Sequence, residues 1–152
     1  PEYGYFAHAI YLLPGQMIPE HAHVKTKFPA KHESWMVEKG WVYNFSEVGD
    51  ETPNAPAIPA THGAIKSKNF VVQNVGDVLR LKKLETFHFM MAGPEGAIVD
   101  EWACYHDNDG LRFTNTKAAL LHEQILFISI TLSVLFCYGV CRPQAEEGGN
   151  VD

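Results

Sequence analysis

Short apolar runs separated by turn-forming residues fill the chain up to about residue 104. The run from Tyr5 to Leu13 is rich in aromatic and aliphatic residues and stops at Pro14-Gly15, which predicts a strand ended by a turn. Breaks at Gly76-Asp77 and at residues 93–96 separate further predicted strands, over residues 70–73, 78–81, 87–91 and 97–104. Many short strands with regular turns predict an all-β sandwich or barrel.

The segment from Trp35 to Phe45 is predicted to form a β-hairpin. Residues 38–40 would supply its turn, because Gly40 can adopt a positive φ. Residues 49–59 contain several Pro and Gly breaks and two acidic residues, and are too rich in proline for a central strand. They are therefore predicted to form a surface loop.

The last third of the chain has a different character. Residues Ile125 to Cys141 form an uncharged apolar run with many β-branched residues, followed by Arg142-Pro143 and an acidic, glycine-rich end. A helix of this length would measure about 25 Å, at the short end of what spans a bilayer. Periodicity leaves open a buried helix, a pair of core strands, a membrane contact or a non-native tail. We expect one β domain over residues 1–117 and a separate C-terminal segment over residues 118–152.

Composition narrows the class of protein. The 152 residues suit one domain with a sizeable core, and 46% apolar with 20% charged residues is typical of a globular protein. The net charge of −6 and the lack of a basic patch exclude a nucleic-acid partner. Three cysteines, Cys104, Cys137 and Cys141, form no CxxC pair, so neither a disulfide framework nor a zinc–thiolate site is indicated. The chain starts at Pro1 without a signal peptide, and we expect a cytoplasmic location.

Histidine spacing is the strongest chemical signal in the sequence. His21 and His23 are two residues apart, so on a strand both side chains point the same way. Glu33 and His88, arriving from other strands, would complete a pocket of three imidazoles and one carboxylate. Such a pocket suits a divalent ion such as Mn, Fe, Co, Ni or Zn. The alternatives are surface histidines at a strand end for His21 and His23, and a core histidine for His88.

Two neighbours of Glu33, His32 and Glu38, are not expected to be ligands. His32 should point to the opposite face of the strand from Glu33. Glu38 is an alternative carboxylate, but it falls in the predicted turn and would face water.

The motif around these residues resembles the first motif of the cupin superfamily. That motif runs Gly, five residues, His-x-His, a short gap, Glu, six residues, Gly; here Gly15 precedes the two histidines and Gly40 follows Glu33. The gap between His23 and Glu33 is longer than usual, which implies a loop insertion, and no Pro-x-Gly turn precedes His88. The resemblance implies a jelly-roll barrel (the double-stranded β-helix), with a metal at His21, His23, Glu33 and His88, and a homodimer.

Within cupins the chain is most similar to sugar isomerases of the D-lyxose isomerase type. That group carries Lys-x-Glu after its His-x-His, as in Lys31-His32-Glu33 here. It also carries an apolar strand ending in Glu, here Glu101, and then an Asn/Asp-rich stretch before an aromatic, here residues 106–113. This similarity implies an aldose–ketose isomerase of carbohydrate metabolism, which acts on D-lyxose or a related sugar and uses Mn, with Fe, Co, Ni and Zn as alternatives.

The residues expected to act on the sugar follow from the proton transfer. An aldose–ketose isomerase moves a proton between C1 and C2, which needs a base and a Lewis acid. Glu101 is the expected base, and of the adjacent pair with Asp100 only one can face the barrel. Lys31 shares a face with Glu33 and is a second proton-transfer candidate, with a solvated surface lysine as the alternative. Arg112 would hold a sugar hydroxyl or close a surface ion pair.

Three questions stay open at the level of the sequence. The four aromatic residues between positions 35 and 45 form either core or a sugar-stacking face: Trp35, Trp41, Tyr43 and Phe45. The same metal pocket would also serve an Fe(II)-dependent cupin dioxygenase, or a non-catalytic cupin that binds a sugar or another small molecule. His106 either belongs to a solvated turn or lines the substrate opening.

Overall fold

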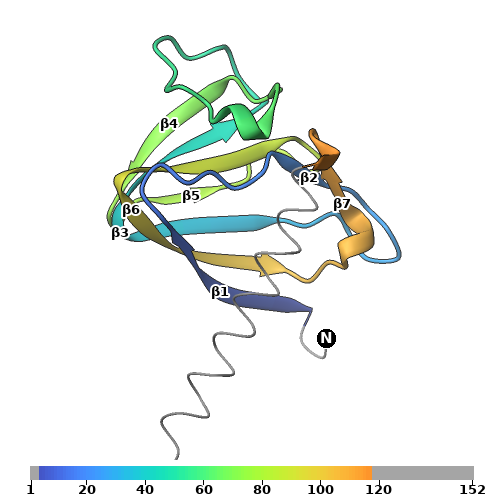
Figure 1. Cartoon of the computed structure of the whole chain (residues 1–152). Helices are drawn as coiled ribbons and strands as arrows, with labels where there is room; N and C mark the ends of the chain where they lie inside the picture. Colours follow the sequence, from blue (N-terminus) through green and yellow to red (C-terminus); the bar gives the residue numbers. More distant parts are fainter. Residues whose placement is uncertain (1–3, 118–152) are drawn as a thin grey trace, which may run out of the picture. The chain divides into compact units, whose positions relative to one another are not determined.

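The structure, a computed structural model, describes residues 4–117 as one curved antiparallel sheet (Figure 1). Its strands are β1 (Tyr5–Leu12), β2 (His21–His23), β3 (Glu33–Ser46), β4 (Asn69–Asn74), β5 (Val78–Arg80), β6 (His88–Cys104) and β7 (Leu111–Phe113). Two single-turn 3-10 helices, η1 (Ala60–His62) and η2 (Asn108–Gly110), lie in the connections. The predicted all-β class and the predicted strands at β1, β4 and β5 are confirmed, as is the loop over residues 49–59.

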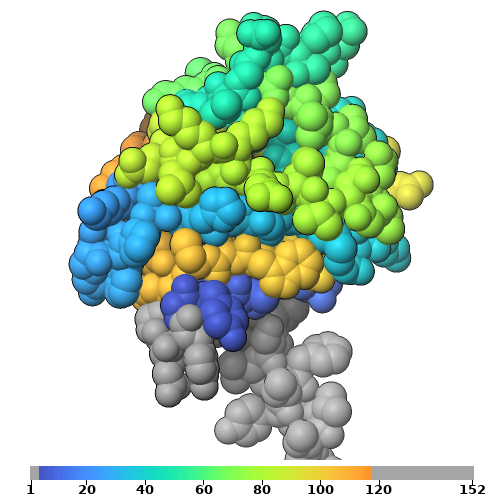
Figure 2. Space-filling model, turned by 180° about the vertical axis from the view of Figure 1, so that it is seen from behind, coloured from blue at the N-terminus to red at the C-terminus, as the bar shows by residue number. Residues whose placement is uncertain are grey.

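Two long strands, β3 and β6, organise the sheet. The first half of β3 pairs with the second half of β6, from Glu33–Ala103 to Gly40–Ala97, and the second half of β3 pairs with the first half of β6. Strand β6 also pairs with β1 and β2, and β3 also pairs with β4 and β5. Figure 2 shows the outer faces of β5, β3, β6 and β1 as successive bands across the back of the molecule. Each long strand therefore carries residues from one wall of the fold to another.

The predicted hairpin over residues 35–45 is wrong, because the chain continues through this segment as the single strand β3. Gly40 does adopt a positive φ of 71°, as the prediction required, but it uses that freedom in a β-bulge. A Cβ atom on Gly40 would collide with the carbonyl oxygen of Gly96 on β6. The glycine therefore allows two backbones to approach closely where the sheet bends, and the chain does not reverse.

The predicted break at residues 93–96 is also wrong, because β6 is continuous from His88 to Cys104. This segment lies where the pairing with β3 changes register, so Pro94 and Glu95 sit exposed at an irregularity of the ladder. A proline is tolerated at such a bulge because no ladder hydrogen bond is lost there. The side chain of Trp41 packs against Gly93, where a Cβ atom would not fit.

The interior holds two hydrophobic clusters. The larger contains Trp35, Val37, Val42, Met90 and Val99 with their neighbours, and the smaller contains Met17, Phe45, Phe89 and Met91. Both draw on alternate residues of β3 and β6, whose side chains point to opposite faces. The described part of the chain has no helix of the length and hydropathy needed to cross a membrane. The apolar run over residues 125–141, and with it the expected C-terminal segment 118–152, lies outside the described residues.

Candidate metal centre

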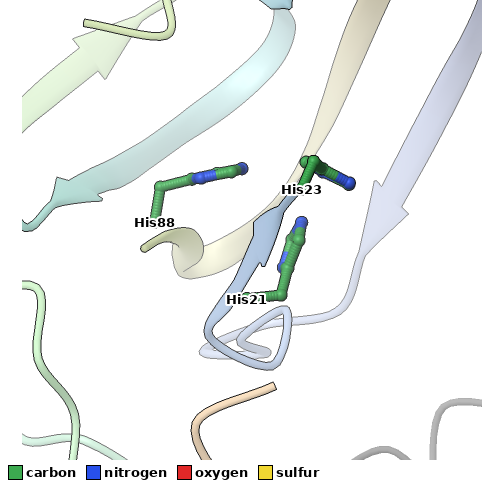
Figure 3. A group of neighbouring side chains, drawn as sticks. All are labelled: His21, His23 and His88. Carbon is green, nitrogen blue, oxygen red and sulfur yellow. The ribbon is translucent and has the colours of Figure 1, made fainter. Parts of the chain in front are cut away.

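Three strands bring the four expected ligands together. His21 and His23 lie on β2, Glu33 begins β3, and His88 begins β6. His21 pairs directly with His88 across the sheet, so their side chains lie on the same face. The ligand nitrogens of the three histidines lie within 4.8 Å of one another (Figure 3). Residues that are far apart in the sequence thus converge on one point inside the fold.

Glu33 lies against two of the three imidazoles. Its Oε1 atom lies 2.8 Å from Nε2 of His88 and 3.3 Å from Nε2 of His23, and its side chain is 1% exposed. These three atoms are buried, and none has a hydrogen bond of normal geometry within the part of the chain that the structure describes. Buried polar atoms are rarely left without a partner, because the lost hydration is not recovered. A cation held between them would satisfy all three, so the residues present fit a metal ion.

Backbone carbonyls fix the orientation of two of the rings. Nδ1 of His21 lies 2.8 Å from the carbonyl oxygen of Pro19, and Nδ1 of His88 lies 3.0 Å from that of Thr86. A carbonyl can only accept, so Nδ1 carries a proton in each ring, and in the neutral form of each ring Nε2 keeps its lone pair. The remaining nitrogen of both rings is therefore a free metal donor, and the carbonyls act as the outer partners that metal-binding histidines usually have.

The protonation states suit metal binding at neutral pH. Burial lowers the pKa of His21 well below its usual value, and the neighbouring His88 and His23 lower it further. Burial also lowers the pKa of His23 from 6.5 to about 4, although Glu33 opposes this. Burial alone would raise the pKa of Glu33, but the adjacent rings of His23 and His88 and the charge of Lys31 hold it well below its ordinary value. His21 and His23 are thus neutral and Glu33 is an ionised carboxylate, the forms that bind metals.

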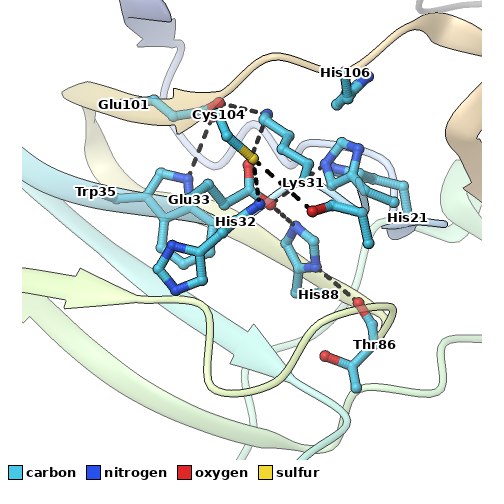
Figure 4. Close-up of polar contacts among 12 residues, drawn as sticks. His21, Lys31, His32, Glu33, Trp35, Thr86, His88, Glu101, Cys104 and His106 are labelled. Carbon is cyan, nitrogen blue, oxygen red and sulfur yellow. Dashed lines mark hydrogen bonds and ion pairs between the residues drawn. The ribbon is translucent and has the colours of Figure 1, made fainter. Parts of the chain in front are cut away.

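A second polar group, centred on Lys31, lies beside the cluster (Figure 4). The Lys31 ammonium group lies 2.7 Å from Oε2 of Glu33 and 2.5 Å from Oε1 of Glu101. The indole N–H of Trp35 donates to Oε2 of Glu101 at 3.3 Å. Burial opposes the charge on Lys31, but Glu33 and Glu101 together raise its pKa above the usual value. The alternative of a solvated surface lysine is therefore wrong, since Lys31 is 5% exposed.

The other predicted residues lie in different surroundings. Of the adjacent acids on β6, Glu101 is 5% exposed and faces the interior, while Asp100 is half-buried. His32 and Glu38 are exposed, as expected of residues that are not ligands. The structure does not bring Arg112 to this site: its guanidinium group is exposed and donates to the carbonyls of Asp109 and Leu111. Its strand partner is Ala22, whose side chain points away from those of His21 and His23.

The aromatic residues divide between core and site. Phe45 is 1% exposed and stacks on Phe89 in the smaller hydrophobic cluster, and Trp41 and Tyr43 pack beside each other. Only Trp35 of the four lines the cavity next to the metal cluster. The core interpretation therefore holds for Phe45 and for Trp35, which also borders the cavity, while Tyr43 packs partly buried against the smaller cluster.

Two further residues lie in this region: His106, for which the sequence left two positions open, and Asn44, which the sequence analysis missed. The ring of His106 packs on that of His23, with centroids 4.4 Å apart, so its place is beside the cluster and not only in a turn. Asn44 lines the cavity, together with Ile18, Phe89, Met90 and residues of the two polar groups. The predicted hairpin gave no reason to expect Asn44 at the site. Asn44 faces inward because of the register in which the continuous strand β3 pairs with β6.

No protein-family model matches the chain. The D-lyxose/D-mannose isomerase of Thermosediminibacter oceani is 32% identical over 123 residues, or 78% of this chain, and the chain spans 66% of that enzyme's length.

Solved structures show the same fold. An L-ribose isomerase of Cellulomonas parahominis, solved with L-psicose, matches with a TM-score of 0.61 and 19% identity, over 76% of this chain and 60% of its own. A Klebsiella pneumoniae protein with a double-stranded β-helix domain matches with a TM-score of 0.50 and 19% identity, over 74% of this chain and 76% of its own. The predicted jelly-roll fold is therefore confirmed.

Proposed function

We propose that this chain, which belongs to the cupin superfamily and is a distant homologue of D-lyxose/D-mannose isomerase, is a metal-dependent aldose–ketose isomerase. The proposed substrate is D-lyxose or a related aldose. The observation that carries the proposal is the convergence of four metal-ligand side chains, three of them buried, next to the buried carboxylate of Glu101. The cluster supplies the Lewis-acid site and Glu101 supplies the proton carrier, and isomerisation needs both.

The metal would be held by His21, His23, Glu33 and His88, and we propose Mn, with Fe, Co, Ni or Zn as alternatives. When bound, the ion would polarise the oxygens on C1 and C2 of the open-chain sugar. With a divalent ion bound, three neutral imidazoles and one carboxylate would give the site a net positive charge. This charge would stabilise the negative charge that develops on these oxygens.

Glu101 is the proposed base. Its carboxylate would remove the proton from C2 of the aldose and return it to C1, while the hydroxyl proton of O2 passes to O1, so that the ketose forms by way of an enediol. The proton leaves and re-enters the substrate, so the reaction consumes no oxidant and no water. Lys31 and Trp35 donate to the two oxygens of Glu101 at 2.5 and 3.3 Å, and so hold the carboxylate in one orientation. This fixed orientation allows one group to serve both carbons.

Lys31 has a separate proposed role. Its ammonium group bridges Glu33 and Glu101, the metal-ligand carboxylate and the base. Without this cation, two buried carboxylates would face each other and one of them would take up a proton. Lys31 therefore compensates both carboxylates and holds Glu101 beside the metal ligands. Its positive charge would also stabilise an enediolate that forms next to Glu101.

The test is isomerisation by protein loaded with Mn, assayed with D-lyxose, D-mannose and L-ribose under anaerobic conditions in deuterated water. We expect ketose to form and deuterium to appear at C1, because the transferred proton exchanges with solvent. The Glu101→Gln variant should lose turnover by at least about 100-fold and keep its metal. Asp100→Asn is the matched control, since it removes the neighbouring half-buried carboxylate.

Other results would point elsewhere. Product that forms only when oxygen is present would identify a cupin dioxygenase that uses Fe(II). Sugar that binds and is recovered unchanged would identify a non-catalytic sugar-binding cupin. A homodimer and a cytoplasmic location stay predictions from the sequence, and sedimentation of the purified protein would check the first.

A further inference from the structure

We propose that Asn44 is a specificity-determining residue, which accepts a hydrogen bond from a sugar hydroxyl beyond C2. The inference rests on the proposed isomerase function and names what the same site recognises. The recognised ligand would be a neutral sugar with a free hydroxyl at the carbon that faces Asn44.

The register of β3 and β6 places Asn44 in the cavity. Asn44 pairs with Met90, and the next pair on the same face of the sheet is Ser46 with His88. Asn44 therefore lies one same-face step from His88, about 7 Å along the strand. The cavity that it lines also contains His21, Glu33, His88 and Glu101. A sugar whose C1 and C2 lie at these groups would extend its later carbons toward Asn44.

Asn44 differs in kind from the rest of the cavity wall. The remaining lining residues outside the two polar groups are apolar, namely Ile18, Phe89 and Met90. Trp35 adds an aromatic surface, with its indole N–H already donated to Glu101. A polar side chain in an otherwise apolar wall usually fixes the orientation of a ligand.

The neighbouring Gln73 decides which end of the Asn44 amide faces the cavity. Gln73 is 1% exposed, and its Nε2 donates to the carbonyl oxygens of Trp35 at 2.8 Å and of Asp77 at 2.9 Å. Only the amide nitrogen can donate to two carbonyls, so Oε1 of Gln73 must face Asn44. Nδ2 of Asn44 donates to that oxygen at 3.2 Å. The amide group of Asn44 is thereby fixed, and Oδ1 is left as the acceptor.

No donor among residues 4–117 hydrogen-bonds to Oδ1 of Asn44. An acceptor with no donor of its own selects for a ligand group that carries a hydrogen, such as a hydroxyl. It gives no favourable contact to a deoxy carbon, and it repels the oxygens of a phosphate or carboxylate at the same position. The geometry therefore points to an unphosphorylated aldose with a free hydroxyl at C3, C4 or C5.

The test compares D-lyxose with its 3-deoxy, 4-deoxy and 5-deoxy analogues, in the parent protein and in the Asn44→Leu and Asn44→Ala variants. For each protein we take the ratio of kcat/KM for D-lyxose to that for each analogue. This ratio is measured on one sample at a time, so it does not depend on how much of a variant is correctly folded. Asn74→Leu, an exposed position on β4, is the matched control.

We expect the parent and Asn74→Leu to prefer D-lyxose over one of the three analogues by about tenfold, the usual worth of one hydrogen bond. Both Asn44 variants should lose that preference, with a ratio near one for the same analogue and unchanged ratios for the other two. An equal preference in the parent and in both Asn44 variants would overturn the inference. So would a parent that tolerates all three deoxy positions.

A binding measurement separates this inference from the proposed function. Calorimetry on the Mn-loaded proteins measures the dissociation constants of D-lyxose and of each analogue, and their ratio gives the preference in binding. Absence of turnover, with binding that prefers D-lyxose only when Asn44 is present, would refute the isomerase and support the role of Asn44. Turnover with ratios that do not depend on Asn44 would support the isomerase and refute the role of Asn44. Absence of both turnover and binding would overturn both.

Discussion

Lys31 and Glu101 form a buried ion pair in which the ammonium nitrogen lies 2.5 Å from the carboxylate oxygen. The same nitrogen lies 2.7 Å from Glu33, so one cation compensates two buried carboxylates. Charged groups are stable in a protein interior only when they are paired and hydrogen-bonded. The metal-ligand carboxylate and the expected base are therefore linked through a single side chain, and its removal should affect both.

The Lys31→Met variant should be destabilised by about 3–5 kcal/mol, the usual cost of removing one partner from a buried ion pair. It should also lose most turnover, because one of the two carboxylates will take up a proton. The free energy of unfolding from urea titration measures the first effect. The matched control is Lys68→Met, since the pair between Lys68 and Glu51 is exposed and should contribute less than about 1 kcal/mol. Equal losses of unfolding free energy in the two variants would show that burial does not strengthen the contribution of Lys31.

Metal binding should depend on the cluster residues and not on nearby histidines in general. We expect about one equivalent of divalent metal in the parent, and at least a 100-fold weaker affinity in His21→Ala and Glu33→Gln. The His32→Ala variant should bind like the parent, because His32 is exposed beside Glu33. Elemental analysis after dialysis against limiting metal gives the answer. Metal retained in Glu33→Gln, with the loss confined to the histidine variants, would remove Glu33 from the ligand set.

The metal-free protein should lose stability as the pH falls from about 6.5 to 4. Between these values the unfolded chain protonates His23, whereas the folded protein keeps it neutral, since its pKa is about 4 when folded. The unfolded state then binds more protons, so stability decreases with decreasing pH, by about 3 kcal/mol in total for this residue. His21, whose pKa is also lowered, adds to the loss in the same direction.

The pH dependence is measured as the free energy of unfolding at several pH values in the presence of a chelator. The His23→Gln variant should show a visibly flatter curve over this range, while His32→Gln should follow the parent. Parallel curves for all three proteins would mean that His23 does not stay neutral in the fold.

Replacing Gly40 should test the close contact between β3 and β6. The Gly40→Ala variant combines an unfavourable positive φ with a collision against the carbonyl of Gly96, and should lose about 3 kcal/mol of stability. Gly76→Ala is the control, because Gly76 also has a positive φ of 84° but has nothing within 4 Å of a Cβ atom. It should lose only about 1 kcal/mol. Thermal and urea unfolding of the two variants give the comparison.

The sequence by itself determined the local features. The two-residue spacing of His21 and His23 puts both side chains on one face of any strand, whatever the rest of the fold does. Alternating apolar residues and turn signals likewise identified β1, β4 and β5, because short strands ended by Pro or Gly leave a local mark. The ligand set with Glu33 and His88 was proposed from a motif, and the structure brings these residues together.

Only the tertiary structure decided the course of the long strands β3 and β6 and which residues face each other across the sheet. Gly40 has the positive φ of a turn residue, but whether that φ makes a turn or a bulge depends on its contact with Gly96, more than fifty residues away in the sequence. The burial of Lys31 is equally non-local, because it follows from Glu101 on the paired strand. The inward position of Asn44 follows from the register between β3 and β6 and from the amide of Gln73. Such pairings are set by packing across the whole sheet, and no local pattern in the sequence encodes them.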